Sequence, residues 1–82
     1  MSNFTKYFMS LTEQGFCEQF RIEMTRRGLN ATSSYFQYMR IEKKCAEYLY
    51  ESNVRNLTQV NLADVISSVC LFEHARVMTV AL

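Results

Sequence analysis

The sequence predicts an all-α protein, a small bundle of three to four helices that forms one domain over residues 1–82. The chain has no proline and only two glycines, whereas an all-β protein of this size needs several turns rich in such residues. Hydrophobic residues make up 49% of the chain, which is enough for a core and too many for a disordered segment. Apolar residues also recur at helical spacing in three successive segments.

The first helix is predicted to begin near Ser10 and to end at two arginines. The stretch from Ser10 to Glu13 fits a capping box, in which the serine hydroxyl accepts from a free amide and the glutamate reaches back. Arg26 and Arg27 suit the negative end of the helix dipole, and Gly28 supplies the left-handed residue that ends many helices. The helix carries a narrow apolar stripe with one thiol alongside: Phe16, Phe20, Met24 and Cys17.

The segment ahead of Ser10 also has apolar residues at the spacing of a helix. They are Phe4, Tyr7, Phe8 and Leu11. This segment is either a short helix or an arm that docks on a partner.

A long helix with a wide apolar face is predicted from Asn30 or Ala31 to Ser52, with Asn30 and Ser33 as alternative N-caps. Its polar residues fall within one arc of about 80°: Gln37, Arg40, Lys44, Glu47 and Glu51. The opposite arc is apolar and wider: Tyr35, Phe36, Tyr38, Met39, Ile41, Cys45, Ala46, Tyr48, Leu49 and Tyr50. A face so wide contacts neighbours on two sides, so this helix is either the centre of the bundle or part of a dimer interface.

Within that arc, four residues are predicted to form an interface with a protein partner or a second copy: Tyr35, Tyr38, Ile41 and Tyr48. Glu42 also falls in the apolar arc and interrupts it. We interpret Glu42 as reaching solvent along its stem or pairing with an arginine from elsewhere. A catalytic carboxylate is disfavoured because no second acid or histidine is placed with it.

The third helix is predicted to begin at Asn61, after Asn53 ends the second helix and residues 54–60 form a connection. Asn61 is the N-cap, and Asp64 lies in the first turn, where a negative charge is favourable. The buried stripe consists of Leu62, Val65, Ile66, Val69 and Phe72. Beyond Phe72 the pattern fails, so the helix ends, bends or meets a different partner there. The apolar tail, residues 77–82, is a helix end, a strand added to another chain, or a truncated element.

The chain carries no constellation typical of an enzyme, a cofactor site or a metal site. It has no phosphate-binding glycine loop, paired carboxylates or nucleophile elbow, and its one histidine, His74, has only Cys70 at helical spacing. The cysteines are far apart and fit small buried thiols in a reducing, cytoplasmic compartment: Cys17, Cys45 and Cys70. No segment approaches the roughly 18 apolar residues of a membrane span. We therefore expect no catalysis, cofactor, metal, small-molecule substrate or membrane partner.

The remaining chemical signal is a group of basic and phosphate-binding residue types at the end of the first helix and along the second. Arg and Lys supply positive charge, and Ser and Asn side chains near a helix N-terminus are good phosphate ligands. The alternative is a solvated helix face on which Lys43 and Glu47 partly cancel, and the net charge of only +1 favours it. The candidate nucleic-acid-binding residues are Arg26, Arg27, Asn30, Ser33, Ser34, Arg40, Lys43 and Lys44.

Several motifs occur in an order that resembles a known family. They are Phe16-x-x-x-Phe20, Arg27-Gly28-Leu29-Asn30, Tyr48-Leu49-Tyr50-Glu51-Ser52-Asn53-Val54 and Leu57-Thr58-Gln59-Val60-Asn61-Leu62-Ala63-Asp64-Val65. Over residues 12–69 this pattern is similar to the SAM-like N-terminal core-binding domain of phage integrases and tyrosine recombinases. In that family a basic-Gly-Leu turn ends the first helix, and a segment with Asp-Val opens the third.

The resemblance implies a domain that clamps DNA without cutting it, because the family's catalytic domain has no counterpart in this sequence. Aligned on Leu49, the family's Thr and Tyr fall on Ser34 and Tyr38, and its aliphatic residue one turn later is Glu42. The family's fourth helix is absent or reduced to the apolar tail. The residues that this resemblance places toward DNA are Ser33, Ser34, Arg40 and Lys44.

Two functions follow as expectations. The first is a non-catalytic DNA-binding helical domain, excised or stand-alone, which the resemblance and the basic residues favour. The second is a small homodimeric module for regulation or protein interaction, of phage, plasmid or bacterial type, that does not bind nucleic acid. The wide apolar arc, the excess of tyrosine and the near-zero net charge favour this alternative.

Overall fold

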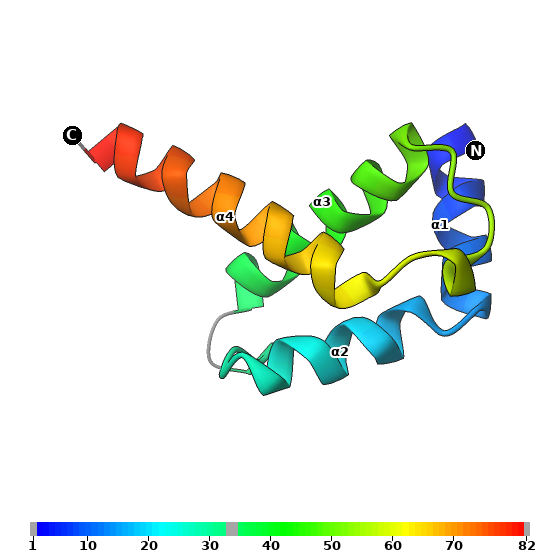
Figure 1. The fold of residues 1–82 in the computed structure, drawn as a ribbon, viewed down its shortest axis with the longest axis horizontal. Helices are drawn as coiled ribbons and strands as arrows, with labels where there is room; N and C mark the ends of the chain where they lie inside the picture. The colour runs from blue at the N-terminus through cyan, green and yellow to red at the C-terminus, as the bar shows by residue number, and fades with distance from the viewer. Residues whose placement is uncertain (1, 33–34, 82) are drawn as a thin grey trace.

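The computed structural model describes the backbone of residues 2–32 and 35–81, and the side chains of this part up to Leu71. This part of the chain holds four α-helices, one short 3-10 helix and no strand (Figure 1), which confirms the expected all-α bundle. The elements are α1 (Asn3–Glu13), α2 (Phe16–Arg26), α3 (Tyr35–Glu51), η1 (Leu57–Gln59) and α4 (Leu62–Ala81).

The wide apolar arc of α3 contacts two neighbouring helices, as predicted. α3 packs against α1 and α4, and α2 also packs against α1 and α4, so the helices form a closed ring of contacts around one core (Figure 1). Each fully buried aliphatic or aromatic side chain contributes about 1.5–3 kcal/mol to the stability of such a core. The buried apolar residues are Leu11, Phe16, Phe20, Met24, Tyr38, Ile41, Cys45, Ala46, Leu49, Leu57, Leu62, Val65, Ile66 and Val69.

The expected capping box at Ser10 is wrong, because Ser10 lies in the last turn of α1. The Ser10 carbonyl accepts from the backbone amide of Gln14 at 3.2 Å, which is an ordinary helical bond. Ser2 caps this helix instead, since its hydroxyl accepts from the Thr5 amide at 3.1 Å. Gly15, at φ 90°, then changes the direction of the chain, and α2 begins at Phe16. Of the two alternatives for the N-terminal segment, the short helix is correct.

Aromatic contacts attach α1 to the rest of the bundle. The ring of Phe4 meets that of Tyr50 edge-on at a centroid distance of 5.6 Å, and Tyr7 approaches the same ring at 5.1 Å. The Tyr7 hydroxyl also donates a hydrogen bond to the Val54 carbonyl. Aromatic pairs at such distances contribute about 0.5–1.5 kcal/mol beyond the burial of their area. The N-terminal helix is therefore held at the C-terminal end of α3.

Two helices are followed by residues with positive φ, at the positions where the sequence predicts the helices to end. Gly28, at φ 80°, follows α2, and the Leu29 amide donates back to the Met24 carbonyl at 3.0 Å. Asn53, at φ 58°, follows α3, and the Val54 amide donates back across the same interval to the Leu49 carbonyl at 3.0 Å. Both arrangements satisfy carbonyls that a helix end otherwise leaves without partners.

α3 begins later than predicted and is otherwise the continuous helix expected. It starts at Tyr35, so Asn30 is not its N-cap, and Ala31 and Thr32 form a turn. The alternative cap, Ser33, lies outside the described residues, as does Ser34. The backbone remains helical without interruption through Glu51.

α4 begins as predicted, and of the alternatives for the tail the helix end is correct. The Asn61 side-chain oxygen accepts from the Ala63 amide at 3.0 Å, which confirms Asn61 as the cap. The stripe Leu62, Val65, Ile66 and Val69 is buried, while the side chain of Phe72 lies outside the described part. The backbone stays helical to Ala81, so the helix does not end near Phe72 and the tail is not a strand. No described helix is long and apolar enough to cross a membrane.

Glu42 is buried in the core, so the interpretation that its carboxylate reaches solvent along its stem is wrong. Its exposed fraction is 8%, and no ion pair with an arginine is found among the described residues. Burial raises the pKa of the Glu42 carboxyl, and a hydrogen bond from Cys17 opposes that rise in part. A buried carboxylate without a cation costs more than an uncharged group of the same shape.

We predict that Glu42→Gln stabilises the protein at neutral pH. A carboxyl with a raised pKa in the folded state gives most stability below about pH 4.5, its ordinary value, and loses it as pH rises through the folded pKa. The variant removes this loss, so its free energy of unfolding at pH 7 should be higher than that of the wild type. Urea unfolding at pH 5 and pH 8 tests this, with the exposed Glu18→Gln as control. A Glu42→Gln variant that is less stable than wild type at pH 8 contradicts the prediction.

Candidate interaction surfaces

Two of the predicted basic residues form ion pairs on their own helices. The Arg26 guanidinium lies 2.9 Å from the Glu23 carboxylate, and the Arg26 side chain is 72% exposed. The Lys44 ammonium lies 3.6 Å from the Glu47 carboxylate, so Lys44 rather than Lys43 is the partner of Glu47. Exposed pairs of this kind contribute little to stability, but they lower the local positive charge.

Arg27 joins two helices, a role that sequence reasoning did not find. Its Nη2 donates to the Ala63 carbonyl at 2.9 Å and to the Ser67 hydroxyl at 2.7 Å, both on α4. Ala63 and Ser67 are four residues apart, so they lie one turn apart on the same face of the helix. The adjacent arginines thus differ: Arg26 bonds within α2, whereas Arg27 fixes the C-terminal end of α2 against the first turns of α4.

We predict that Arg27→Ala lowers the free energy of unfolding by about 1–2 kcal/mol, because it removes two hydrogen bonds from a charged donor. The matched control is Arg26→Ala, which removes one exposed pair within a helix and should cost less than about 0.5 kcal/mol. Thermal or urea unfolding of the two variants measures the difference. Equal losses for the two variants would contradict a joining role for Arg27.

The other candidate nucleic-acid residues have a mixed placement. Arg40, Lys43 and Lys44 lie three and four residues apart on α3, so they share one side of that helix. Arg26 and Arg27 stand at the end of a different helix, and Asn30 is exposed in the connection that follows. Ser33 and Ser34 lie outside the described residues.

The thiols are buried to different extents. Cys45 is fully buried, and burial, with smaller contributions from Cys70 and Glu42, raises its pKa to about 12. Burial also raises the pKa of Cys70, which is half-buried like Cys17. A thiol with a raised pKa is a poor nucleophile and a poor metal ligand. Among the described residues, no three potential ligand side chains are grouped to hold a metal ion.

The predicted protein interface is wrong for two of its four residues. Tyr38 and Ile41 are 6% and 3% exposed and pack in the chain's own core. Burial raises the pKa of the Tyr38 hydroxyl, with Glu42 and Cys17 adding to the rise and Arg21 opposing it. The other two predicted interface residues, Tyr35 and Tyr48, are 58% and 48% exposed.

An exposed apolar cluster occupies the first turns of α3, and we name it the α3 patch: Tyr35, Phe36 and Met39. Phe36 is 87% exposed, and its ring meets that of Tyr35 edge-on at a centroid distance of 5.7 Å. Met39 follows one turn later and is 41% exposed. The angular position of Phe36 could have revealed this cluster, because at 100° per residue it lies on the opposite side of the helix from Ile41 and Cys45. Leu71, on α4, is also an exposed apolar residue, with an exposed fraction of 72%.

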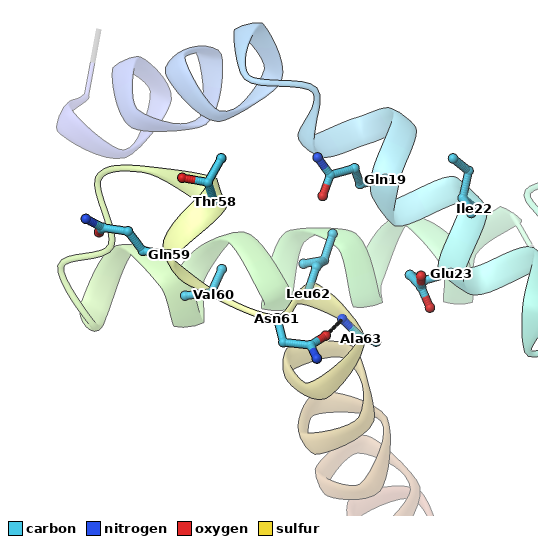
Figure 2. Close-up of a pocket in the computed structure, with 9 residues that line it drawn as sticks. All are labelled: Gln19, Ile22, Glu23, Thr58, Gln59, Val60, Asn61, Leu62 and Ala63. Atoms are coloured by element: carbon cyan, nitrogen blue, oxygen red, sulfur yellow. Dashed lines mark hydrogen bonds between the residues drawn. The ribbon is translucent and has the colours of Figure 1, made fainter.

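A separate open groove runs between α2 and the segment that joins η1 to α4 (Figure 2). Its volume is about 530 Å³. Figure 2 shows Leu62 below Gln19 of α2, with Val60 to its left and Glu23 to its right, and Asn61 capping α4 beneath it. The groove is lined by Gln19, Ile22, Glu23, Thr58, Gln59, Val60, Asn61, Leu62 and Ala63.

Comparison with protein-family models, with curated proteins and with solved structures finds no significant match to this chain. The resemblance to integrase core-binding domains therefore stays a prediction from the motifs.

Proposed function

We propose that this protein is an interaction module that associates with a second copy of itself through the α3 patch and the C-terminal half of α4. The observation that carries the proposal is the 87% exposure of Phe36, beside the exposed rings and chains of Tyr35 and Met39. Single exposed apolar residues are common, but a contiguous group that includes aromatic rings is typical of a protein-binding surface.

The arrangement of α4 supports the same proposal. The second half projects beyond the other three helices (Figure 1), and Leu71 at its start is 72% exposed. Its sequence is nevertheless apolar, with Val77, Met78 and Val80. Most helical stability in proteins comes from packing an apolar face, so a partner that covers this half stabilises it.

The charge distribution favours a second copy over a polyanion. The net charge of +1 gives two copies almost no mutual repulsion. Arg26, Arg27 and Lys44 already bond to acceptors in their own chain. Cations that are already paired gain little from phosphate groups, whereas exposed apolar side chains gain from burial.

We predict that the full chain is a dimer at high micromolar concentration and that Phe36→Ser weakens the dimer at least about tenfold, as loss of a central aromatic contact does. Sedimentation equilibrium measures both. The control is Tyr48→Ser, which removes an exposed ring from a different side of α3 and should leave the dissociation constant within about threefold, as a residue outside the interface core does. A monomeric wild-type chain, or a stronger effect of Tyr48→Ser than of Phe36→Ser, contradicts self-association through the α3 patch.

DNA binding is the second candidate function. The observation that favours it is the exposed Lys43, which stands beside Arg40 on the outer side of α3. The resemblance to integrase core-binding domains implies that residues of the same helix contact DNA. Two adjacent cations on one helix face can contact neighbouring phosphates, although they carry no sequence information by themselves.

If DNA is the partner, affinity for duplex DNA falls steeply with salt, and Lys43→Ala lowers the salt slope by about one phosphate contact. A fluorescence-anisotropy titration at several salt concentrations measures the slope. The exposed Lys6→Ala on α1 is the control, because it removes the same charge from another helix and leaves the slope unchanged. Binding that is absent at low salt, or that does not vary with salt, excludes this candidate.

A further inference from the structure

We propose that the groove between α2 and the η1–α4 segment binds a short, uncharged peptide segment that carries one aliphatic side chain. This site is formed by α2, η1 and the first turn of α4, whereas the proposed self-association uses the α3 patch and the far half of α4. The two proposals therefore rest on different residues and can fail separately.

The charge of the groove argues for an uncharged ligand. None of its lining residues is a lysine or an arginine, and its one carboxylate, Glu23, is paired with Arg26 at 2.9 Å. Phosphate-bearing ligands need cations near the bound anion. Asp64, in the first turn of α4, adds negative charge near the start of that helix and opposes an anion there. A nucleic acid is thus a poor occupant of this site.

The polar groups of the groove match a peptide group. The Gln19 carboxamide, on the α2 wall, has donors and an acceptor, and no bond to it is found among the described residues. The amino group of Asn61 has two further donors, while its oxygen caps the Ala63 amide. A peptide group likewise has one donor and one acceptor. A ligand peptide can therefore pair with Gln19 in both directions without leaving a buried polar group unsatisfied.

The apolar part of the groove argues for one side chain of moderate size. Leu62 is 5% exposed and lies below Gln19 (Figure 2), with half-buried Val60 beside it. Ile22 is 39% exposed, although most apolar residues of α2 are buried. An aliphatic ligand side chain that covers Ile22 would remove apolar surface from water on both partners. The volume of about 530 Å³ is within the range of small-ligand sites.

The test uses the full chain and N-acetyl-leucine N′-methylamide, the smallest neutral probe with two amide groups and one aliphatic side chain. NMR titration should show saturable shifts of the Gln19 side-chain amide and the Ile22 methyl signals. The glycine analogue of the probe should bind about fivefold more weakly, because it lacks the apolar side chain. Gln19→Ala and Ile22→Ser should each weaken binding of the leucine probe by a similar factor.

The control variant is Gln37→Ala, which removes the same carboxamide from an exposed position on α3 and should leave binding unchanged. Adenosine 5′-monophosphate serves as the competing class of ligand and should cause no saturable shift at Gln19. Shifts that do not saturate with the leucine probe overturn the proposal, as does equal binding of the glycine analogue. Tighter binding of the nucleotide would replace it with a nucleotide site.

Discussion

The buried stripe of α3 positions the other three helices. Tyr38 meets Phe20 of α2 edge-on at 5.1 Å, and Tyr50, at the C-terminal end of α3, contacts the aromatic rings of α1. Between these contacts Cys45 is fully buried, beside Cys70 of α4. A helix that binds a different neighbour at each level has to be continuous, because a break would turn one set of contacts away from its partners. α3 is unbroken from Tyr35 to Glu51, which is why one helix can organise so small a core.

The same stripe explains both the buried carboxyl and the exposed rings. Glu42 lies four residues after Tyr38, so it shares the buried side of α3 and is carried into the core with it. Phe36 lies two residues before Tyr38 and is therefore turned toward solvent. A buried carboxyl and an exposed aromatic ring are both unfavourable for stability. A local conflict of this kind points to a requirement other than folding, and for Phe36 a protein contact is the simplest one.

Local signals in the sequence predicted the helices and several of their ends, but not the contacts between distant residues. Gly28 and Asn53 ended helices as expected, because a positive φ is a property of one residue and its neighbours. The helix start predicted at Ser10 is wrong because the capping pattern also fits the last turn of a helix. Only the turn at Gly15 distinguishes a helix start from a helix end here. The acceptors of Arg27 lie 36 and 40 residues away in the chain, so no local pattern contains them. The sequence likewise shows how wide the apolar arc of α3 is, but it does not show which part of that arc the other helices bury.

The contacts of the charged residues decide what kind of recognition the surface can support. Composition counts nine cations, yet Arg27 is bonded to α4, and both Arg26 and Lys44 face carboxylates on their own helices. Two surfaces of the described chain contain no cation: the α3 patch and the groove between α2 and the η1–α4 segment. Binding at such surfaces depends on shape and on apolar area removed from water, so it gains little from electrostatic steering. The dependence of binding on salt concentration therefore distinguishes the proposed functions. Contacts at the patch or the groove persist as ionic strength rises, whereas contacts with phosphates are lost.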